Sequence, residues 1–332
     1  MFENLIEILK ANPRKIVYTE GTDARILESA ARLKKAGFLT PVLVGAVDDV
    51  KAAAAKGGFD IEGLEILDPA TYPKMDEMVK TMFELRKGKM SEEECRAALL
   101  KGNYFGTMLV KMGVADALLG GATYSTADTV RPALQIVKTK KGANLVSSCF
   151  ILVREGEMLA MGDCAINIAY EDRKDKEGNV TLSAAAQLAE VALATAHTAK
   201  VFGMDPKVAM LSYSTKGSGK GANVDLVRNA TAIAKEMAPD LAIDGEMQFD
   251  AAVSPVVGQL KFPGSKVAGY ANTFIFPEIQ SGNIGYKIAQ RLGGFAAYGP
   301  ILQGLNAPIN DLSRGCDAEE VYQMSIITAA LV

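Results

Sequence analysis

The sequence predicts an α/β protein of two domains, each with a mainly parallel sheet flanked by helices. Short apolar runs alternate with amphipathic helical segments along almost the whole chain, which is the pattern of parallel strands joined by crossover helices. A chain of 332 residues is also longer than one average domain. We place the first domain at 1–147 plus 301–332 and the second at 148–300, and we expect the functional site in the cleft between them.

The first domain is expected to contain apolar strands at 16–18, 41–45 and 115–119. After the first of these, Thr22 or Asp23 can cap a helix that Gly37 ends. Ser91, followed three residues later by Glu94, forms a capping-box pattern and predicts another helix start. A polar loop after the strand at 115–119 then opens a further helix.

The second domain is expected to begin with a β-hairpin, because runs at 146–153 and 158–164 flank the polar sequence Arg-Glu-Gly-Glu. The charged segment 171–178 reads as a solvated surface loop. The alternation of helices and strands then resumes, with a helix at 182–202, a strand at 208–212, a helix at 223–237, a strand at 267–276 and a helix at 284–292.

Composition excludes several classes of protein. The formal net charge of −3 disfavours a nucleic-acid partner, because such proteins carry a basic surplus. The single histidine, His197, and widely spaced cysteines disfavour a zinc cluster and indicate reduced, cytoplasmic thiols. The N-terminus is acidic where a signal peptide would be basic, and no apolar run reaches the ~18 residues of a membrane span.

A polar segment near the C-terminus carries the strongest chemical signal. The stretches 298–304 and 310–316 precede a tail, 317–332, whose apolar residues have helical spacing. Ser313 and Arg314 are therefore expected at or just before a helix N-terminus, where N–H groups and the dipole favour anions. The arginine can hold a phosphate through two parallel hydrogen bonds, and the serine can donate to an oxygen that gains charge.

The chain resembles the phosphate acetyltransferases (phosphotransacetylases) over nearly its whole length. Five segments carry the resemblance in the same order, and together they are highly specific. They are 126–135 (TADTVRPALQ), 212–218 (SYSTKGS), 244–252 (DGEMQFDAA), 282–287 (GNIGYK) and 298–316 (YGPILQGLNAPINDLSRGC).

The resemblance implies an acyltransferase of acetate metabolism that moves an acetyl group reversibly between acetyl phosphate and coenzyme A. It implies direct attack by the thiol in a ternary complex, with coenzyme A as a substrate, no permanently bound cofactor and no catalytic metal. It further implies a homodimer and a two-domain architecture like that of isocitrate and isopropylmalate dehydrogenases, with the active-site cleft between the domains.

The resemblance assigns the acyl phosphate to Arg314 and the substrate carbonyl to Ser313. The family has an aspartate six residues after this arginine, where the present sequence has Glu320. Glu320 keeps the carboxylate that accepts the thiol proton, but the carboxylate is one methylene further from the backbone. Its neighbours Glu319 and Asp317 are therefore alternative bases.

Further residues are predicted to bind substrate. Arg131 is expected in the first turns of a helix, where a cation is disfavoured unless an anion compensates it, and the resemblance assigns it to substrate. Arg86 is a candidate by resemblance alone. The other predicted substrate contacts are Tyr298, Gly299, Thr126 and Thr129, and the predicted coenzyme A contacts are Lys216 and Lys287.

Three rival readings remain open at this point. A phosphate butyryltransferase would use the same chemistry on a larger acyl group. A non-catalytic acetyl-CoA sensor would keep the fold without the base. A metal-dependent decarboxylating dehydrogenase would need a cluster of aspartates and a nicotinamide site, neither of which the sequence supplies. Cys316 is read as a structural or cleft-lining residue rather than as an acyl-carrying nucleophile, and His197 is read as structural.

Overall fold

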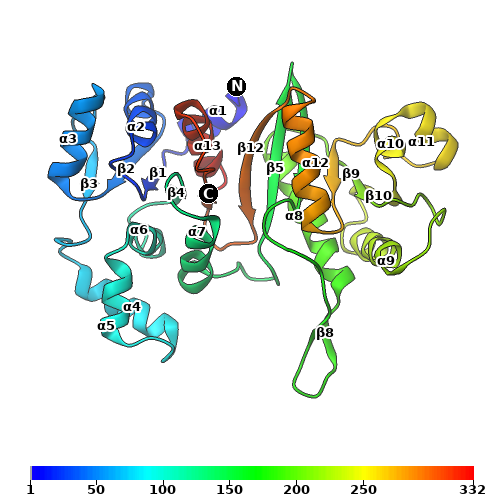
Figure 1. Ribbon diagram of the computed structural model, residues 1–332, viewed down its shortest axis with the longest axis horizontal. Helices are drawn as coiled ribbons and strands as arrows, with labels where there is room; N and C mark the ends of the chain where they lie inside the picture. The colour runs from blue at the N-terminus through cyan, green and yellow to red at the C-terminus, as the bar shows by residue number, and fades with distance from the viewer. Residues whose placement is uncertain (1) are drawn as a thin grey trace. The chain divides into compact units, whose positions relative to one another are not determined.

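The computed structural model describes residues 2–332, and their contacts divide the chain into two compact units (Figure 1). Unit 1 comprises the described residues up to Lys141 together with Leu305–Val332, and unit 2 is Gly142–Gly304. The domain limits expected from the sequence, 1–147 with 301–332 and 148–300, remain a proposal. No helix within residues 2–332 is long and apolar enough to cross a membrane.

Unit 1 is built on a fully parallel sheet with the strand order β13-β4-β1-β2-β3. The expected strands at 16–18, 41–45 and 115–119 are confirmed with small shifts of their ends. The strands are β1 Lys15–Tyr18, β2 Thr40–Val44, β3 Glu65–Leu67, β4 Ala117–Gly120 and β13 Ile309–Asp311. From β1 the chain winds outward through β2 and β3, and then returns to add β4 and β13 on the other side of β1.

Helices cover both faces of this sheet. They are α1 Glu3–Ala11, α2 Ala24–Ala36, α3 Val47–Gly57, α4 Met75–Arg86, α5 Glu92–Leu99, α6 Gly102–Lys111, α7 Thr126–Pro132, the π-helical turn η1 Ala133–Val137 and α13 Ala318–Ala330. Helices α1 and α2 pack against α13, whereas α4 and α6 pack against η1. The predicted caps are confirmed: Asp23 rather than Thr22 caps α2, Gly37 ends it, and Ser91 and Glu94 form both bonds of the capping box.

Unit 2 contains a mixed sheet with the order β10-β9-β11-β6-β5-β12. Its strands are β5 Ser147–Arg154, β6 Glu157–Gly162, β9 Lys207–Leu211, β10 Ala242–Met247, β11 Thr273–Ile275 and β12 Ala296–Gln303. The pairs from β10 to β6 are parallel, whereas β5 is antiparallel to both β6 and β12. The expected hairpin is therefore confirmed, and both units have the predicted mainly parallel α/β class.

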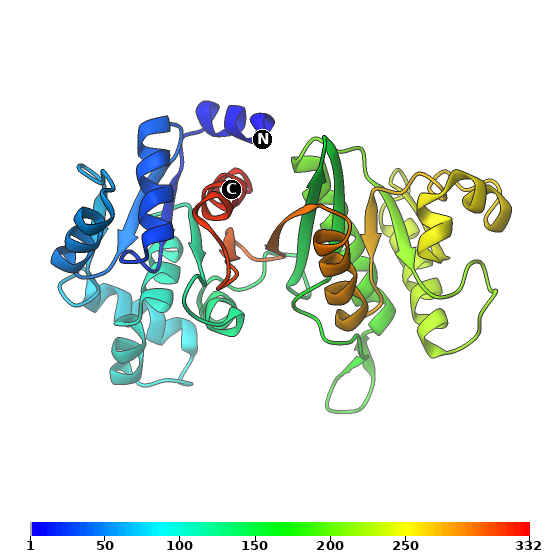
Figure 2. The same cartoon turned by 45° about the horizontal axis from the view of Figure 1, so that its top comes forward.

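The helices of unit 2 bury both faces of its sheet. They are α8 Ala184–Val201, α9 Ala222–Met237, α10 Phe249–Val253, α11 Pro255–Lys261 and α12 Ile279–Arg291. Alternate residues of β9 enter different cores: Val208 and Met210 pack with α8 and α9, whereas Ala209 and Leu211 face the opposite core. The small hairpin of β7 Arg173–Lys174 and β8 Val180–Leu182 projects from this unit, with the expected charged loop at its tip (Figure 2).

Two predicted elements of unit 2 have wrong limits. The strand expected at 267–276 is only β11, because the N–H groups of Gly269 and Ala271 donate to carbonyls of α10 instead of to a neighbouring strand. Helix α12 starts at Ile279, five residues before the expected 284, because the Glu278 carboxylate accepts from the N–H groups of Gln280 and Ser281. Strand β12 was not expected.

Candidate active site

Three loops of unit 1 meet where the parallel strands β1, β4 and β13 end. The order of the sheet reverses between β1 and β4, and such a switch point is where open α/β sheets place their ligands. The loop after β13 is joined to the end of β4 by a hydrogen bond of 2.7 Å from the Leu312 N–H to the Gly120 carbonyl. The predicted residues Ser313, Arg314 and Arg131 all lie on segments that leave this edge.

Asp311, the last residue of β13, ties its strand to helix α7. Its buried carboxylate accepts hydrogen bonds from the hydroxyls of Thr126, at 2.6 Å, and Thr129, at 2.5 Å. Burial raises the pKa of Asp311 to about 6, against the lowering effect of these two hydroxyls. Gly121 has φ of 98°, and a Cβ there would lie 2.2 Å from an Asp311 carboxylate oxygen. The predicted substrate contacts Thr126 and Thr129 therefore donate to a carboxylate of the protein itself.

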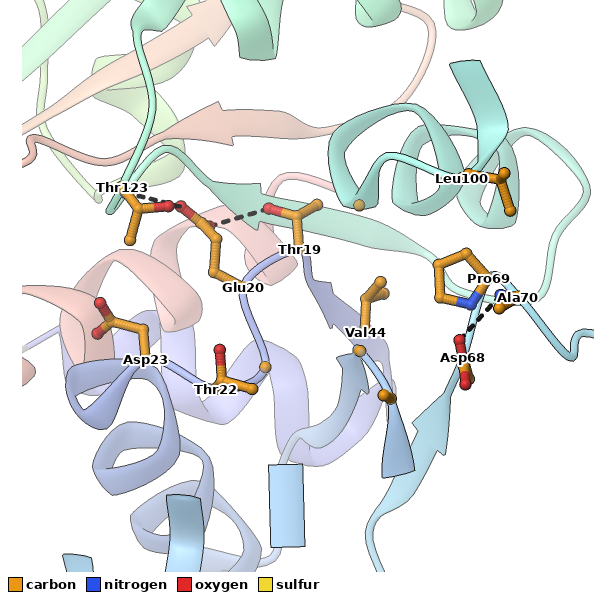
Figure 3. A pocket seen from close by; sticks show the side chains of 14 residues that line it. Thr19, Glu20, Thr22, Asp23, Val44, Asp68, Pro69, Ala70, Leu100 and Thr123 are labelled. Atoms are coloured by element: carbon orange, nitrogen blue, oxygen red, sulfur yellow. Dashed lines mark hydrogen bonds between the residues drawn. The ribbon is translucent and has the colours of Figure 1, made fainter. Parts of the chain in front are cut away.

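Glu20 ties the loop after β1 to the loop after β4. Its carboxylate accepts from the backbone N–H groups of Gly121, at 3.2 Å, and Thr123, at 2.8 Å, and from the hydroxyls of Thr123 and Thr19 (Figure 3). Burial raises the pKa of Glu20. The Thr19 hydroxyl also lies 2.6 Å from the Tyr124 hydroxyl. The loops on both sides of the switch point are thus joined by a network of part-buried and exposed polar contacts.

Ser313 and Arg314 lie in the exposed loop just before α13, as predicted. Arg314 forms no ion pair within residues 2–332, neither with Asp311 nor with Glu319. Glu319 instead binds Arg32 at 2.6 Å. The Ser313 hydroxyl accepts the Gly315 N–H at 3.2 Å and donates to no residue of the described chain. The arginine charge and the serine hydrogen are therefore both available to a ligand.

The three candidate bases at the start of α13 have different surroundings. Asp317 caps the helix by accepting the Glu320 N–H at 2.8 Å. Glu319 accepts from Gln323 and pairs with Arg32, and these bonds lower its pKa. Glu320 is half-buried, and its charge reaches the Cys316 thiol at the end of the Ser313 loop. Glu320 thus lies beside the loop that carries Ser313 and Arg314.

Cys316 lies beside these residues but is poorly suited to attack. Its thiol is buried, and burial together with the Glu320 charge raises its pKa to about 11. A nucleophilic cysteine needs a lowered pKa so that the thiolate is populated.

His197, read from the sequence as structural, lies on α8 of unit 2.

The two further arginines lie at helix ends. Arg131 is exposed and lies in the second turn of α7, within the first turns of the helix as expected, and η1 continues the helix from Ala133. Arg86 ends α4, and its buried Nε has no hydrogen-bond partner. Within the described chain neither guanidinium forms an ion pair with a carboxylate. Both charges are thus available to an anionic substrate.

Lys216 lies in the loop between β9 and α9 of unit 2. Its ammonium is 4.8 Å from the centre of the Phe262 ring, and it borders a cavity of about 560 Å³ with Arg228. The neighbouring amides, however, face an internal anion: the buried Glu246 carboxylate accepts from the Gly217 N–H at 2.6 Å and from the Ser214 hydroxyl at 3.0 Å. This loop therefore wraps a carboxylate of the protein itself.

The other predicted contacts of unit 2 lie on α12 and β12. Lys287 is exposed on α12. Tyr298 and Gly299 are buried in β12, which pairs with β5. A Cβ at Gly299 would lie 2.7 Å from the Phe150 ring, so packing alone accounts for this glycine.

A cavity of about 780 Å³ opens at the ends of β1, β2 and β3, and it is bordered by Thr19, Glu20 and Thr123 of the switch-point loops (Figure 3). Glu20, Asp23 and Asp68 contribute acidic groups to its lining, and none of its lining residues is a lysine or arginine. None of the predicted site residues borders it, and its charge does not suit a phosphate. Among residues 2–332 no group of three or more His, Cys, Asp or Glu side chains is placed to hold a metal ion.

The sequence reading missed Glu20, Tyr124, Arg25 and the tethering role of Asp311. Asp311 lies inside the C-terminal motif, and Glu20 directly follows a predicted strand. Polar residues at the carboxyl end of a buried parallel strand are a usable signal for a site. Arg25 gives no such signal. It lies in the first turn of α2, directly after the Asp23 cap, and the cap alone accounts for this part of the sequence.

Comparison with known proteins gives one consistent result. A family model described as phosphate acetyl/butaryl transferase matches residues 1–329. The phosphate acetyltransferase of Bacillus subtilis (strain 168) is 51% identical over 330 residues, which cover 99% of this chain and 98% of the relative. The phosphate acetyltransferase of Staphylococcus epidermidis (strain ATCC 12228 / FDA PCI 1200) is 50% identical over 321 residues, covering 95% of this chain and 94% of the relative.

Solved structures agree with this result. The chain is similar to a phosphotransacetylase from Streptococcus pyogenes, with a TM-score of 0.93 and 52% identity over 99% of this chain and 97% of the other. A branched-chain phosphotransacylase from Enterococcus faecalis V583 has a TM-score of 0.67 at 18% identity, covering 96% of this chain and 98% of the other. The second likeness shows the fold alone. The expected likeness to the dehydrogenases stays a prediction.

Proposed function

Because the chain belongs to the phosphate acetyl/butaryl transferase family, we propose that the edge formed by the loops after β1, β4 and β13 transfers an acetyl group between acetyl phosphate and coenzyme A. The protein is a phosphate acetyltransferase by its close similarity to enzymes of that name. The observation that carries the site is the presence of Ser313, Arg314 and Arg131 on segments tied together at this edge by Asp311.

The first step of the proposed mechanism is removal of a proton from the coenzyme A thiol. With a pKa of about 8.5, only a few per cent of a thiol is thiolate at neutral pH, so a nearby base raises the fraction that can attack. Glu320 is the proposed base because it stands six residues after Arg314, where the family has an aspartate, and because it lies half-buried beside Cys316 of the Ser313 loop. The proton passes from sulfur to the Glu320 carboxylate.

The thiolate then attacks the carbonyl carbon of acetyl phosphate. A carbon–sulfur bond forms and the carbonyl oxygen gains negative charge, which the Ser313 hydroxyl stabilises by donating a hydrogen bond. The bond between the carbonyl carbon and the phosphate oxygen breaks, and its electron pair leaves with the phosphate. Arg314 and Arg131 stabilise that departing charge. The reverse reaction follows the same steps in the opposite order.

Coenzyme A offers phosphates to the remaining cations. Arg86 has a buried Nε without a partner, and Lys216 and Lys287 are the proposed contacts in unit 2. We assign Thr126 and Thr129 to positioning, since their hydroxyls donate to Asp311. Tyr298 and Gly299 stay proposed substrate contacts.

The proposal also includes a homodimer in the cytoplasm. An exposed apolar stripe on α12 supports self-association: Ile284, Ile288 and Leu292 lie at helical spacing, with exposed fractions of 58%, 53% and 84%. The four cysteines are free, which fits a reducing compartment.

The similarities do not favour the rival functions. The relatives at about half identity are named phosphate acetyltransferases, whereas the branched-chain phosphotransacylase shares only 18% of its sequence. The test is thioester formation from coenzyme A with acetyl phosphate and, in parallel, butyryl phosphate. A preference for acetyl phosphate supports the proposal. A preference for butyryl phosphate would make the chain a butyryltransferase, and acetyl-CoA binding without turnover would make it a sensor.

A further inference from the structure

Arg25, near the start of α2, holds the main chain of the Ser313 loop. Its Nη1 donates to the carbonyl oxygens of Arg314, at 2.9 Å, and Cys316, at 3.1 Å. Its Nη2 donates to the carbonyl of Ala122, at 2.8 Å, in the loop after β4. One guanidinium therefore joins three segments that are distant in the sequence.

The cap of α2 fixes the orientation of this guanidinium. Asp23, the cap residue, accepts from Nε at 3.0 Å and from Nη2 at 2.8 Å. A guanidinium has five N–H groups, and these contacts engage all of them: two with Asp23 and three with main-chain carbonyls. Arg25 thus differs from Arg314, Arg131 and Arg86, which form no ion pair in the described chain. No N–H group of Arg25 is left to bind a phosphate.

We propose that Arg25 is a positioning residue, which fixes the backbone of the loop from Ser313 to Cys316 so that the exposed Ser313 and Arg314 side chains meet the substrate in a productive geometry. The inference rests on the proposed function of these two residues. It assigns Arg25 no contact with acetyl phosphate or coenzyme A.

The physical need for such a residue follows from the exposure of the loop. Residues Ser313, Arg314 and Gly315 are exposed, so little packing restrains them. Within the loop, the Cys316 N–H donates to the Ser313 carbonyl at 3.0 Å, which leaves the carbonyls of Arg314 and Cys316 to Arg25. A misplacement of about 1 Å at a reacting group can cost about 10²-fold in rate. Loss of the Arg25 contacts would permit such a displacement.

A lysine cannot replace this arginine. Its ammonium is a compact point charge with three donors, whereas the planar guanidinium reaches two carbonyls of one loop, one of another and both oxygens of Asp23. Arg25→Lys keeps the positive charge near the site and removes the planar set of N–H donors. It separates a positioning role from a purely electrostatic one.

Arg32 provides a matched control on the same helix. It binds Glu319 of α13 at 2.6 Å, and its guanidinium carbon lies 4.2 Å from the centre of the Tyr322 ring. It therefore joins α2 to α13, whereas Arg25 joins α2 to the loop before α13. Arg32→Ala tests the effect of loosening the helix pair alone.

The experiment compares the wild type, Arg25→Ala, Arg25→Lys and Arg32→Ala in steady-state acetyl transfer, and it measures alkylation of Cys316 by a thiol reagent with peptide mapping. We expect kcat/KM for acetyl phosphate to fall about 10²-fold in Arg25→Ala and about 10-fold or more in Arg25→Lys, with Arg32→Ala within twofold of the wild type. Added guanidinium ion should restore part of the Arg25→Ala activity. Cys316 should be alkylated faster in Arg25→Ala because the released loop exposes its thiol, although loss of the Arg25 charge raises the pKa of that thiol. The buried Cys95, Cys149 and Cys164 should keep their rates.

The two readouts separate the inference from the proposed function. Wild-type protein that forms no acetyl-CoA would refute the proposed function, while faster Cys316 alkylation in Arg25→Ala would still support the positioning of the loop. An active wild type with Arg25→Ala and Arg25→Lys both within threefold of it, and with unchanged Cys316 alkylation, would overturn the inference. If Arg25→Ala does not fold, Arg25→Lys decides the question by the same two readouts.

Discussion

The carboxylate of Asp311 accepts a 2.5 Å hydrogen bond from the hydroxyl of Thr129, a residue 182 positions earlier in the chain. Asp311 ends β13, just before the loop of Ser313 and Arg314, and Thr129 lies on α7 two residues before Arg131. The bond therefore couples the two segments that carry the proposed phosphate contacts.

Asp311→Asn should lower kcat about 10-fold or more while leaving the chain folded, because the amide cannot accept both threonine hydroxyls as a carboxylate does and α7 would shift with Arg131. Steady-state kinetics measure the effect. Asp116→Asn is the control, since Asp116 accepts the Lys15 N–H near the amino end of β4, at the opposite edge of the sheet. Equal losses in both variants would contradict the coupling.

The buried Asp311 also predicts a pH dependence of stability. Its folded pKa, about 6, lies above its ordinary value of 3.8, so the folded state binds a proton more readily than the unfolded state. Its contribution to stability is therefore complete below pH 4 and is lost as the pH rises through about 6. The unfolding free energy of the wild type relative to Asp311→Asn should fall by roughly 2 kcal/mol across this interval, as measured in urea. A constant difference would contradict the raised pKa.

Glu320→Gln should lower kcat about 10²-fold and change the KM for coenzyme A little, because the amide keeps the shape and loses the ability to accept the thiol proton. Glu320→Asp should retain part of the activity, because it keeps a carboxylate that can accept the thiol proton but places it one methylene closer to the backbone. Glu319→Gln is the control and should lose only its bond to Arg32. Near-normal kcat in Glu320→Gln would place the base elsewhere.

Arg131→Ala should raise the KM for acetyl phosphate about 10-fold, since a charge-assisted hydrogen bond to phosphate contributes about 1.5–3 kcal/mol. Initial rates at varied acetyl phosphate measure this. Arg96→Ala removes an exposed pair with Asp76 and should change neither KM nor kcat. An unchanged KM in Arg131→Ala would remove this residue from the site.

Glu246→Gln should destabilise the protein by about 2 kcal/mol, because Glu246 is only 2% exposed and accepts from Gly217 and Ser214. Denaturant unfolding measures the change. Asp250→Asn, in an exposed pair with Lys261, should stay within about 0.5 kcal/mol of the wild type. Equal stability of both variants would show that the loop does not depend on the buried carboxylate.

Local signals account for the parts of the fold that the sequence predicted. Asp23 begins α2 and Gly37 ends it through contacts within a few residues, and the Ser91 capping box is likewise local. Strand β12 was not predicted from the sequence because it contains Gly299 and Pro300, which ordinarily mark turns. In addition, its pairing partner β5 is distant in the sequence.

The same distinction applies to the site. Ser313 and Arg314 belong to a motif with a recognisable chemistry, so the sequence alone indicates them. Arg25 donates hydrogen bonds to carbonyls that lie 289 and 291 residues away in the sequence. Glu20 accepts hydrogen bonds from N–H groups that lie about a hundred residues away. Such contacts depend on sheet order, which periodicity does not specify.

The most direct test of the central claim is the effect of Arg314→Ala on acetyl-CoA formation. Arg314 should be the residue that holds the departing phosphate, since it forms no ion pair within the described chain. We predict a fall in kcat of at least about 10²-fold, a raised KM for acetyl phosphate and an unchanged unfolding transition. Wild-type kinetics in this variant would contradict the account.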